Sequence, residues 1–100
     1  MNTQELYQKS ENYLKQLLTD KLPKGSQFFL FGSRAEGKAS FAADIDIGIL
    51  PAMPLDNRLL LELQEHIAES FIPYEVDLVD FSEISLEFKQ QALKKIIRWN

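Results

Sequence analysis

Two acids alternate with isoleucines in the segment DIDIGI, which covers residues 44–49. Successive side chains of a β-strand point to opposite faces, so a strand here places Asp44 and Asp46 on one face and the isoleucines on the other. Two like charges so close on one face of an apolar strand are costly unless a cation lies between them. Oxygen-only ligands of this kind suit Mg²⁺, which usually takes one or two carboxylates plus substrate phosphates. The segment therefore predicts a half-buried strand that carries a metal site.

Cap residues and apolar spacing predict the elements before this strand. Asn2 and Glu5 have capping-box spacing at the start of a helix over residues 3–20. Residues 27–31, with the sequence QFFLF, are short, aromatic and apolar, which is typical of a strand buried on both faces. Residues 34–43 then form a turn or short helix with a polar loop.

Similar signals predict the elements after it. Asp56 can cap a helix over residues 57–70, and residues 75–80 form a third strand. Ser82 can cap a last helix, whose apolar face is Ile84, Phe88, Leu93, Ile96 and Ile97. The order helix, strand, strand, helix, strand, helix predicts an α+β fold (α/β two-layer), in which helices pack on a small mixed sheet. We expect residues 1–100 to form a single domain.

The composition excludes several classes of protein. Apolar residues make up 45% of the chain, which is ordinary for a globular protein. There is no cysteine, so neither a disulfide framework nor a thiolate metal site can form. No apolar run approaches the ~20 residues of a membrane span, and the N-terminus lacks the order of a signal peptide. We therefore expect a cytoplasmic protein with no membrane partner.

The net charge of -4 disfavours nucleic acid as a partner, because such binding normally needs a basic surface. It does not exclude a nucleotide, since a bound metal ion can invert the local field. Gly32 and Ser33 lie where the strand of residues 27–31 ends, and free amides at such a turn can bind an anion. Arg34 adds a positive charge that could contact a polyphosphate or a partner. By itself a Gly-Ser turn is more often an ordinary tight turn.

A third acid, Asp77, lies in the middle of the strand of residues 75–80. If that strand pairs beside the DIDIGI strand, Asp77 can join Asp44 and Asp46. Three carboxylates could then hold two Mg²⁺ ions roughly 3.5–4 Å apart, the spacing used for in-line phosphoryl and nucleotidyl displacement. Asp77 is well placed to act as a base toward the attacking group. The alternatives are that these acids lie on solvated sheet surface, or that Glu75 or Asp80 is the functional acid.

Three segments together resemble the minimal nucleotidyltransferases (MNT), which belong to the DNA polymerase beta-like nucleotidyltransferase superfamily. They are residues 32–37 (GSRAEG), 44–47 (DIDI) and 76–79 (VDLV). The resemblance extends over nearly the whole chain. Many members of the family carry a second basic residue where this chain has Glu36, and serine or threonine just before the first acid, where it has Ala43.

The resemblance implies a role for each motif. It makes Gly32 and Ser33 the triphosphate-binding turn, and it makes Asp44, Asp46 and Asp77 the metal-binding and catalytic triad. It implies ATP as the substrate and Mg²⁺ as the metal. Such domains are commonly paired with a helical HEPN-domain protein as antitoxin to toxin. In that setting the enzyme transfers AMP units to a tyrosine of the toxin.

The leading hypothesis is thus a nucleotidyltransferase with a protein acceptor, because one hundred residues leave no segment for an acceptor pocket. Large apolar residues near the helix ends also exceed what one small core needs: Phe71, Ile72, Ile96, Ile97 and Trp99. One alternative is an antitoxin that binds its partner without catalysis. Another is a small-molecule nucleotidyltransferase that works as a homo-oligomer.

Overall fold

The isoleucines of the DIDIGI segment lie at the centre of a four-stranded mixed sheet. The computed structural model describes residues 1–100. Its strands have the order β3-β2-β1-β4 and are β1 (Gln27–Phe31), β2 (Ile45–Leu50), β3 (Val76–Asp80) and β4 (Ile97–Arg98). β1 pairs antiparallel with both β2 and β4, whereas β2 and β3 are parallel. The predicted α+β class with a mixed sheet is confirmed.

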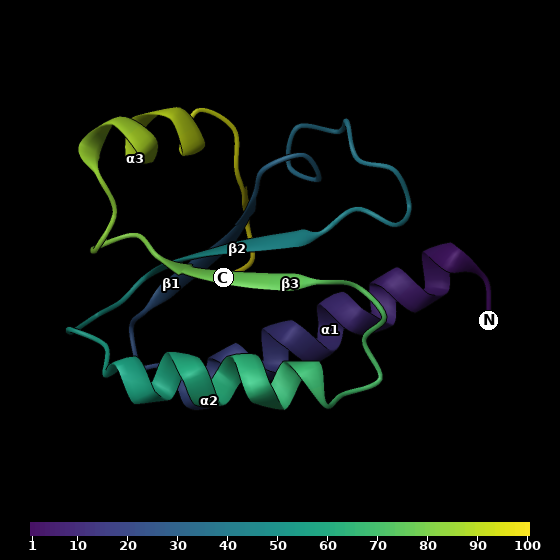
Figure 1. Cartoon of the computed structure of the whole chain (residues 1–100), viewed down its shortest axis with the longest axis horizontal. Coiled ribbons are helices and arrows are strands. Elements are labelled where there is room, and N and C mark those ends of the chain that lie inside the picture. Colours follow the sequence, from purple (N-terminus) through teal and green to yellow (C-terminus); the bar gives the residue numbers. More distant parts are fainter.

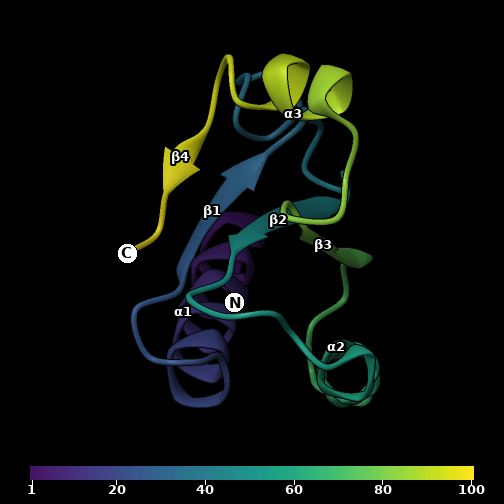
Figure 2. The same ribbon diagram turned by 90° about the vertical axis from the view of Figure 1, so that its left-hand side faces the viewer.

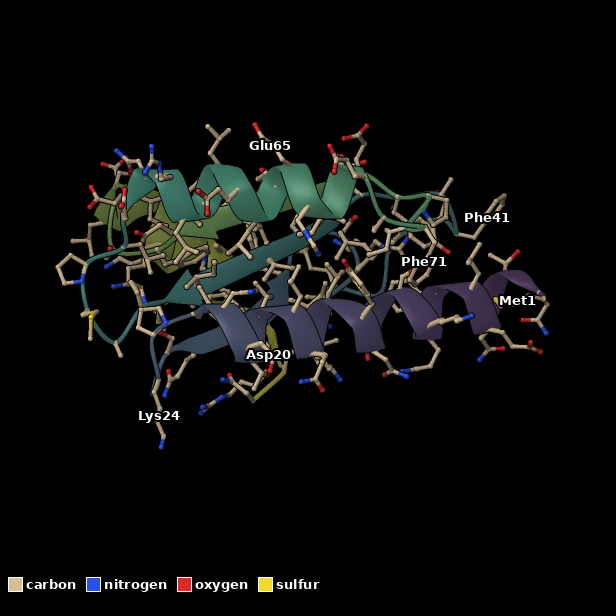
Figure 3. The ribbon with its side chains drawn as sticks, turned by 90° about the horizontal axis from the view of Figure 1, so that it is seen from below. Met1, Asp20, Lys24, Phe41, Glu65 and Phe71 are labelled. Atoms are coloured by element: carbon tan, nitrogen blue, oxygen red, sulfur yellow. The ribbon has the colours of Figure 1, made fainter.

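Two helices, α1 (Thr3–Lys21) and α2 (Asn57–Ala68), lie together against one face of the sheet (Figures 1 and 3). Between them and the sheet lies the larger core cluster. Its fully buried members include Ile45, Ile47 and Ile49 from β2 and Leu14 and Leu18 from α1. The alternation in DIDIGI therefore fixes which face of β2 the helices cover. None of the three helices of the chain has the length and apolarity needed to cross a bilayer.

The third helix, α3 (Leu86–Ala92), lies on the opposite face (Figure 2). It packs near a small aromatic cluster of Phe29, Phe31 and Phe81. A Cβ at Gly48 would overlap the rings of Phe29 and Phe81, so this glycine lets the aromatic rings approach the β2 backbone closely. Because α3 is short, it covers only part of this face and leaves the acidic end of β2 open.

The predicted caps of the first two helices are confirmed. The Asn2 side chain accepts a hydrogen bond from the Glu5 amide at 2.8 Å and donates one to the Glu5 carboxylate at 2.9 Å. Asp56 accepts from the Arg58 amide at 2.9 Å. These bonds satisfy amides that have no partner within the helix. The ends of the elements differ from the prediction by one or two residues; β2, for example, begins at Ile45 and not at Asp44.

The predicted start of the last helix is wrong. Ser85, not Ser82, is its N-cap, and it accepts from the Phe88 amide at 3.1 Å. Ser82 is used in the turn after β3, where its amide and its hydroxyl both donate to Asp80, at 2.9 and 2.6 Å. The helix accordingly starts one turn later than its serines suggested, because a short-range bond to Asp80 competes for the first of them.

A fourth strand replaces the predicted end of that helix. Ile97 pairs with Leu30 of β1, and the Asn100 side chain accepts from the Phe28 amide at 2.9 Å. Of the apolar residues at the helix ends, Ile72 is buried and Trp99 packs against the core, so the chain itself uses them. Phe71 and Ile97 remain about half exposed.

Candidate active site

Asp46 and Asp77 are brought together by the parallel pairing of β2 and β3, in which they are register partners. Neighbouring side chains in register lie on the same face of a sheet, and here it is the face opposite α1 and α2. Asp44 lies in the loop directly before β2. Burial raises the pKa of the Asp46 carboxyl above its ordinary value, and the negative charges of Asp77 and Asp44 raise it further. The three acids that the sequence singled out therefore interact electrostatically.

No basic side chain neutralises this acidic cluster. The one salt bridge of the chain joins Lys15 and Glu11 on α1, at 3.0 Å. The cluster is also not a ready-made metal cage, since no three His, Cys, Asp or Glu side chains are grouped closely enough to hold an ion. A cation between these like charges would offset their repulsion. An all-oxygen donor set with no counter-charge fits Mg²⁺, which often completes its shell with substrate phosphates.

Gly32, at the end of β1, lies directly against the Asp46 carboxylate. Its neighbour Phe31 is the cross-strand partner of Asp46, and a Cβ added to Gly32 would overlap an Asp46 carboxylate oxygen. Its φ of +75° is also in the left-handed region that other residues rarely adopt. Glycine is therefore required here twice, once for the backbone turn and once for the space that the acid occupies.

The turn that follows presents free amides beside the acids. The Glu36 amide donates to the Gly32 carbonyl at 3.1 Å, and the Lys38 amide donates to the Ser33 carbonyl at 3.0 Å. The amides of Ser33 and Arg34 have no protein acceptor. Successive unpaired amides in such a turn can bind an anion. The assignment of Gly32 and Ser33 to the triphosphate remains a prediction that this geometry favours.

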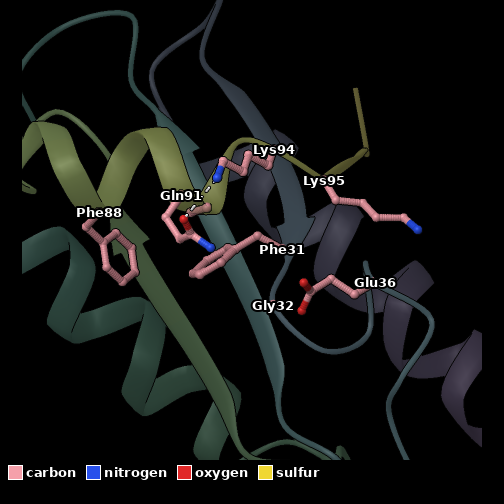
Figure 4. Close-up of a pocket in the computed structure, with 8 residues that line it drawn as sticks. Phe31, Gly32, Glu36, Phe88, Gln91, Lys94 and Lys95 are labelled. Carbon is pink, nitrogen blue, oxygen red and sulfur yellow. Dashed lines mark hydrogen bonds between the residues drawn. The ribbon is translucent and has the colours of Figure 1, made fainter.

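A pocket of about 280 Å³ opens between this turn and the C-terminal end of α3 (Figure 4). Phe31 and Phe88 contribute aromatic rings, and Lys94 and Lys95 contribute positive charge. Sequence reasoning did not single out these two lysines as pocket residues. No local pattern could have found the pocket, because it depends on where α3 packs.

Arg34 is engaged with the loop that leads to Asp44. Its guanidinium donates to the carbonyls of Phe41 at 3.2 Å, of Ala43 at 2.7 and 3.1 Å, and of Asp44 at 3.2 Å. Its side chain also lies over the rings of Tyr7 and Tyr74, with the guanidinium carbon 4.5 and 4.9 Å from the ring centroids. The contact of Arg34 with polyphosphate remains a prediction. In the structure its guanidinium bonds to the loop of residues 41–44.

Gln64 of α2 holds the outer edge of β3 at Asp77, which sequence reasoning also missed. Its side-chain amide donates to the Val76 carbonyl at 3.0 Å and accepts from the Leu78 amide at 2.8 Å. These two groups flank Asp77, so the glutamine takes the place of a further strand. The two other candidate acids have different surroundings, because Asp80 closes a turn with Ser82 and Glu75 is exposed.

Carboxylates on adjacent strands, beside a glycine turn with free amides, are typical of proteins that act on phosphate groups through a metal ion. Comparison with known proteins identifies the class more closely. The family model described as "Polymerase beta, Nucleotidyltransferase" matches residues 12–98, and the chain belongs to this family.

Two curated proteins that are similar in sequence are named as protein adenylyltransferases. The chain is 39% identical over 88 residues to the protein adenylyltransferase MntA of Shewanella oneidensis, which is 88% of this chain and 63% of that protein. It is 40% identical over 60 residues to the probable protein adenylyltransferase MntA of Haemophilus influenzae, which is 60% of this chain and 53% of that protein. The chain thus spans less than two thirds of the length of either relative.

Solved structures of similar fold and sequence belong to toxin-antitoxin proteins. A crystal structure of a toxin-antitoxin with AMP-PNP has a TM-score of 0.75 at 38% identity, over 88% of this chain and 70% of that one. A structure of tri-AMPylated Shewanella oneidensis HEPN toxin in complex with MNT antitoxin has a TM-score of 0.71 at 36% identity, over 91% of this chain and 69% of that one. The resemblance to the minimal nucleotidyltransferases is confirmed.

Proposed function

We propose that this chain transfers AMP from ATP to a hydroxyl of a helical HEPN-type toxin and so acts as its antitoxin. The observation that carries the proposal is the pairing of Asp46 with Asp77 directly beside Gly32. The similarity to proteins named protein adenylyltransferase, and to an MNT antitoxin solved with an AMPylated HEPN toxin, supports both the reaction and the partner.

In this proposal Asp44, Asp46 and Asp77 would hold Mg²⁺, which would neutralise charge on the triphosphate and lower the pKa of the attacking hydroxyl. The oxygen of the acceptor hydroxyl attacks the α-phosphorus of ATP. The bond from that phosphorus to the bridging oxygen breaks, and pyrophosphate leaves. Asp77 takes the proton of the hydroxyl, which is a tyrosine in the reaction that the family resemblance implies. An exposed acid on the edge strand β3 suits this role, since an acceptor on another protein can reach it.

The surroundings of the acids support ATP as the donor. The free amides of Ser33 and Arg34 suit phosphate oxygens. The adjacent pocket of about 280 Å³ combines two aromatic rings with the positive charges of Lys94 and Lys95 and the negative charge of Glu36. A concave site with aromatic walls and a few charged groups is the common form of a ligand pocket.

Exposed aromatic residues near the site support a protein as the acceptor. Phe41 is 73% exposed and lies three residues before Asp44, where it projects at one end of the molecule (Figure 3). Phe88, which lines the pocket with Gly32, is 47% exposed. Aromatic side chains are enriched in protein interfaces, so an acceptor protein can use these two exposed rings.

The test is to incubate the chain with the HEPN-type partner, Mg²⁺ and ATP labelled in the α-phosphate. We expect label on a partner hydroxyl, and we expect Asp77→Asn to stop the labelling. Glu75→Gln is the matched control, because it removes a nearby exposed acid that is not in register with Asp46. It should transfer AMP at close to the normal rate.

Three results would contradict the proposal. Tight binding of the partner without label transfer would indicate an antitoxin that acts by contact alone. Efficient labelling of small molecules, with no partner binding, would indicate a small-molecule nucleotidyltransferase. Loss of labelling in Glu75→Gln but not in Asp77→Asn would show that the catalytic acid is Glu75 and not Asp77.

A further inference from the structure

Both peptide carbonyls that flank the α-carbon of Asp44 accept hydrogen bonds from one side chain. The Arg34 guanidinium donates to the carbonyl of Ala43, which precedes Asp44, and to the carbonyl of Asp44 itself. The next amide, of Ile45, donates to the Glu75 carbonyl at 2.8 Å. The backbone of Asp44 is thus held on both sides although it lies in a loop and not in a strand.

The guanidinium is itself held in place. It lies over the ring of Tyr7, from α1, and over the ring of Tyr74, in the segment before β3. A planar guanidinium can stack on aromatic rings and still donate in its plane to several carbonyls, which a lysine ammonium cannot do. Arg34 therefore connects the helix layer, the loop of Asp44 and the approach to β3.

We propose that Arg34 is a positioning residue, which fixes the Asp44 carboxylate for Mg²⁺ through the loop carbonyls and does not bind the triphosphate. This inference rests on the proposed function, in which Asp44 is a metal ligand. Without the arginine, the loop of residues 41–44 has no other side chain that bonds its carbonyls. The Asp44 carboxylate would then have to be ordered by the metal ion at the moment of binding.

The first measurement uses the metal-free protein. In Arg34→Lys the positive charge remains, but one ammonium cannot replace the several bonds of the guanidinium. We expect faster hydrogen exchange at the Ile45 amide and unchanged exchange in the middle of β1. Arg58→Lys is the matched control, since it makes the same change on an exposed helix position where the side chain forms no hydrogen bond or salt bridge.

The second measurement is the thermal shift in Mg²⁺ titrations at saturating AMP-PNP, where no turnover occurs. Loss of an outer-shell partner of a ligand typically weakens metal binding 10–100-fold, so Arg34→Lys should raise the Mg²⁺ midpoint about tenfold. The AMP-PNP midpoint at saturating Mg²⁺ should stay nearly unchanged. Tyr7→Leu, which removes one ring, should shift the Mg²⁺ midpoint in the same direction but by less, whereas Tyr7→Phe should resemble the unaltered protein.

Asp44→Asn, in the same titration, separates the two proposals. If Asp44→Asn raises the Mg²⁺ midpoint and Arg34→Lys does not, the positioning role is wrong and the proposed function stands. If Asp44→Asn leaves the midpoint unchanged, Asp44 is not a metal ligand and both fail. If Arg34→Lys weakens AMP-PNP binding even at saturating Mg²⁺, the arginine contacts phosphate and the inference is overturned.

Discussion

Replacing Gly32 by alanine tests how closely the turn after β1 approaches the Asp46 carboxylate. The added methyl group meets two obstacles, the left-handed backbone with φ of +75° and the Asp46 carboxylate that fills the space of a Cβ. Gly37, five residues on, provides a matched control. Its φ is +73°, but nothing lies within 4 Å of where its Cβ would be. Both variants share the backbone strain, and only Gly32→Ala displaces Asp46.

The magnitude follows from these two terms. A left-handed alanine costs about 1–2 kcal/mol, from which the stiffer unfolded chain recovers roughly 0.4–1 kcal/mol. Gly37→Ala should therefore lower the free energy of unfolding by roughly 0–1.6 kcal/mol. Gly32→Ala must also push the Asp46 side chain off its rotamer, which adds roughly 0.5–1.5 kcal/mol. In a domain of this size each kcal/mol shifts Tm by about 4–8 °C.

The assay is chemical and thermal unfolding of both variants, followed by AMP transfer. We expect Gly32→Ala to be the less stable by about 1 kcal/mol and to lose most activity, because Asp46 moves away from Asp77. Gly37→Ala should keep most activity. Combining each change with Asp46→Ala should remove the excess destabilisation of Gly32→Ala, since the clash then has no partner. Equal stability of the two single variants would refute the reasoning.

The other predictions concern the acids, the turn and the edge strand. In metal-free protein Asp46→Asn should raise the free energy of unfolding at pH 7, because a raised pKa in the folded state means that folding disfavours the charged carboxyl. This gain in stability should shrink as the pH falls through the raised pKa toward the ordinary value of 3.8. If unfolding at pH 7 and at pH 4 shows the same gain, the charge of Asp46 is not its cause. Ser33→Ala should weaken ATP binding by about 0.5–1.5 kcal/mol in a titration with Mg²⁺ and barely alter Tm, whereas an unchanged dissociation constant would make the turn an ordinary one. Gln64→Leu should destabilise the fold by about 1–3 kcal/mol by leaving two edge groups of β3 unpaired. Gln64→Glu keeps the acceptor for the Leu78 amide, so its stability should lie between those of Gln64→Leu and the unaltered protein. Unaltered urea midpoints in both variants would show that water satisfies those groups.

Local signals in the sequence determined the elements and the faces of the strands. The caps at Asn2 and Asp56 depend on residues two or three positions away, and both formed as expected. The alternation in DIDIGI correctly placed the isoleucines in the core and Asp46 on the other face. Such signals act within one helical turn or a few strand residues, so they do not depend on how distant segments pack.

Only the tertiary structure decided the features that join distant segments. The two-residue strand β4 has no pattern of its own and exists because it pairs with β1, and the bond between Phe28 and Asn100 spans 72 positions. Packing across the fold also brought the side chains of Arg34 and Gln64 to the backbone beside Asp44 and Asp77. A side chain's partners across the fold depend on the packing of all the elements at once, which no local spacing contains.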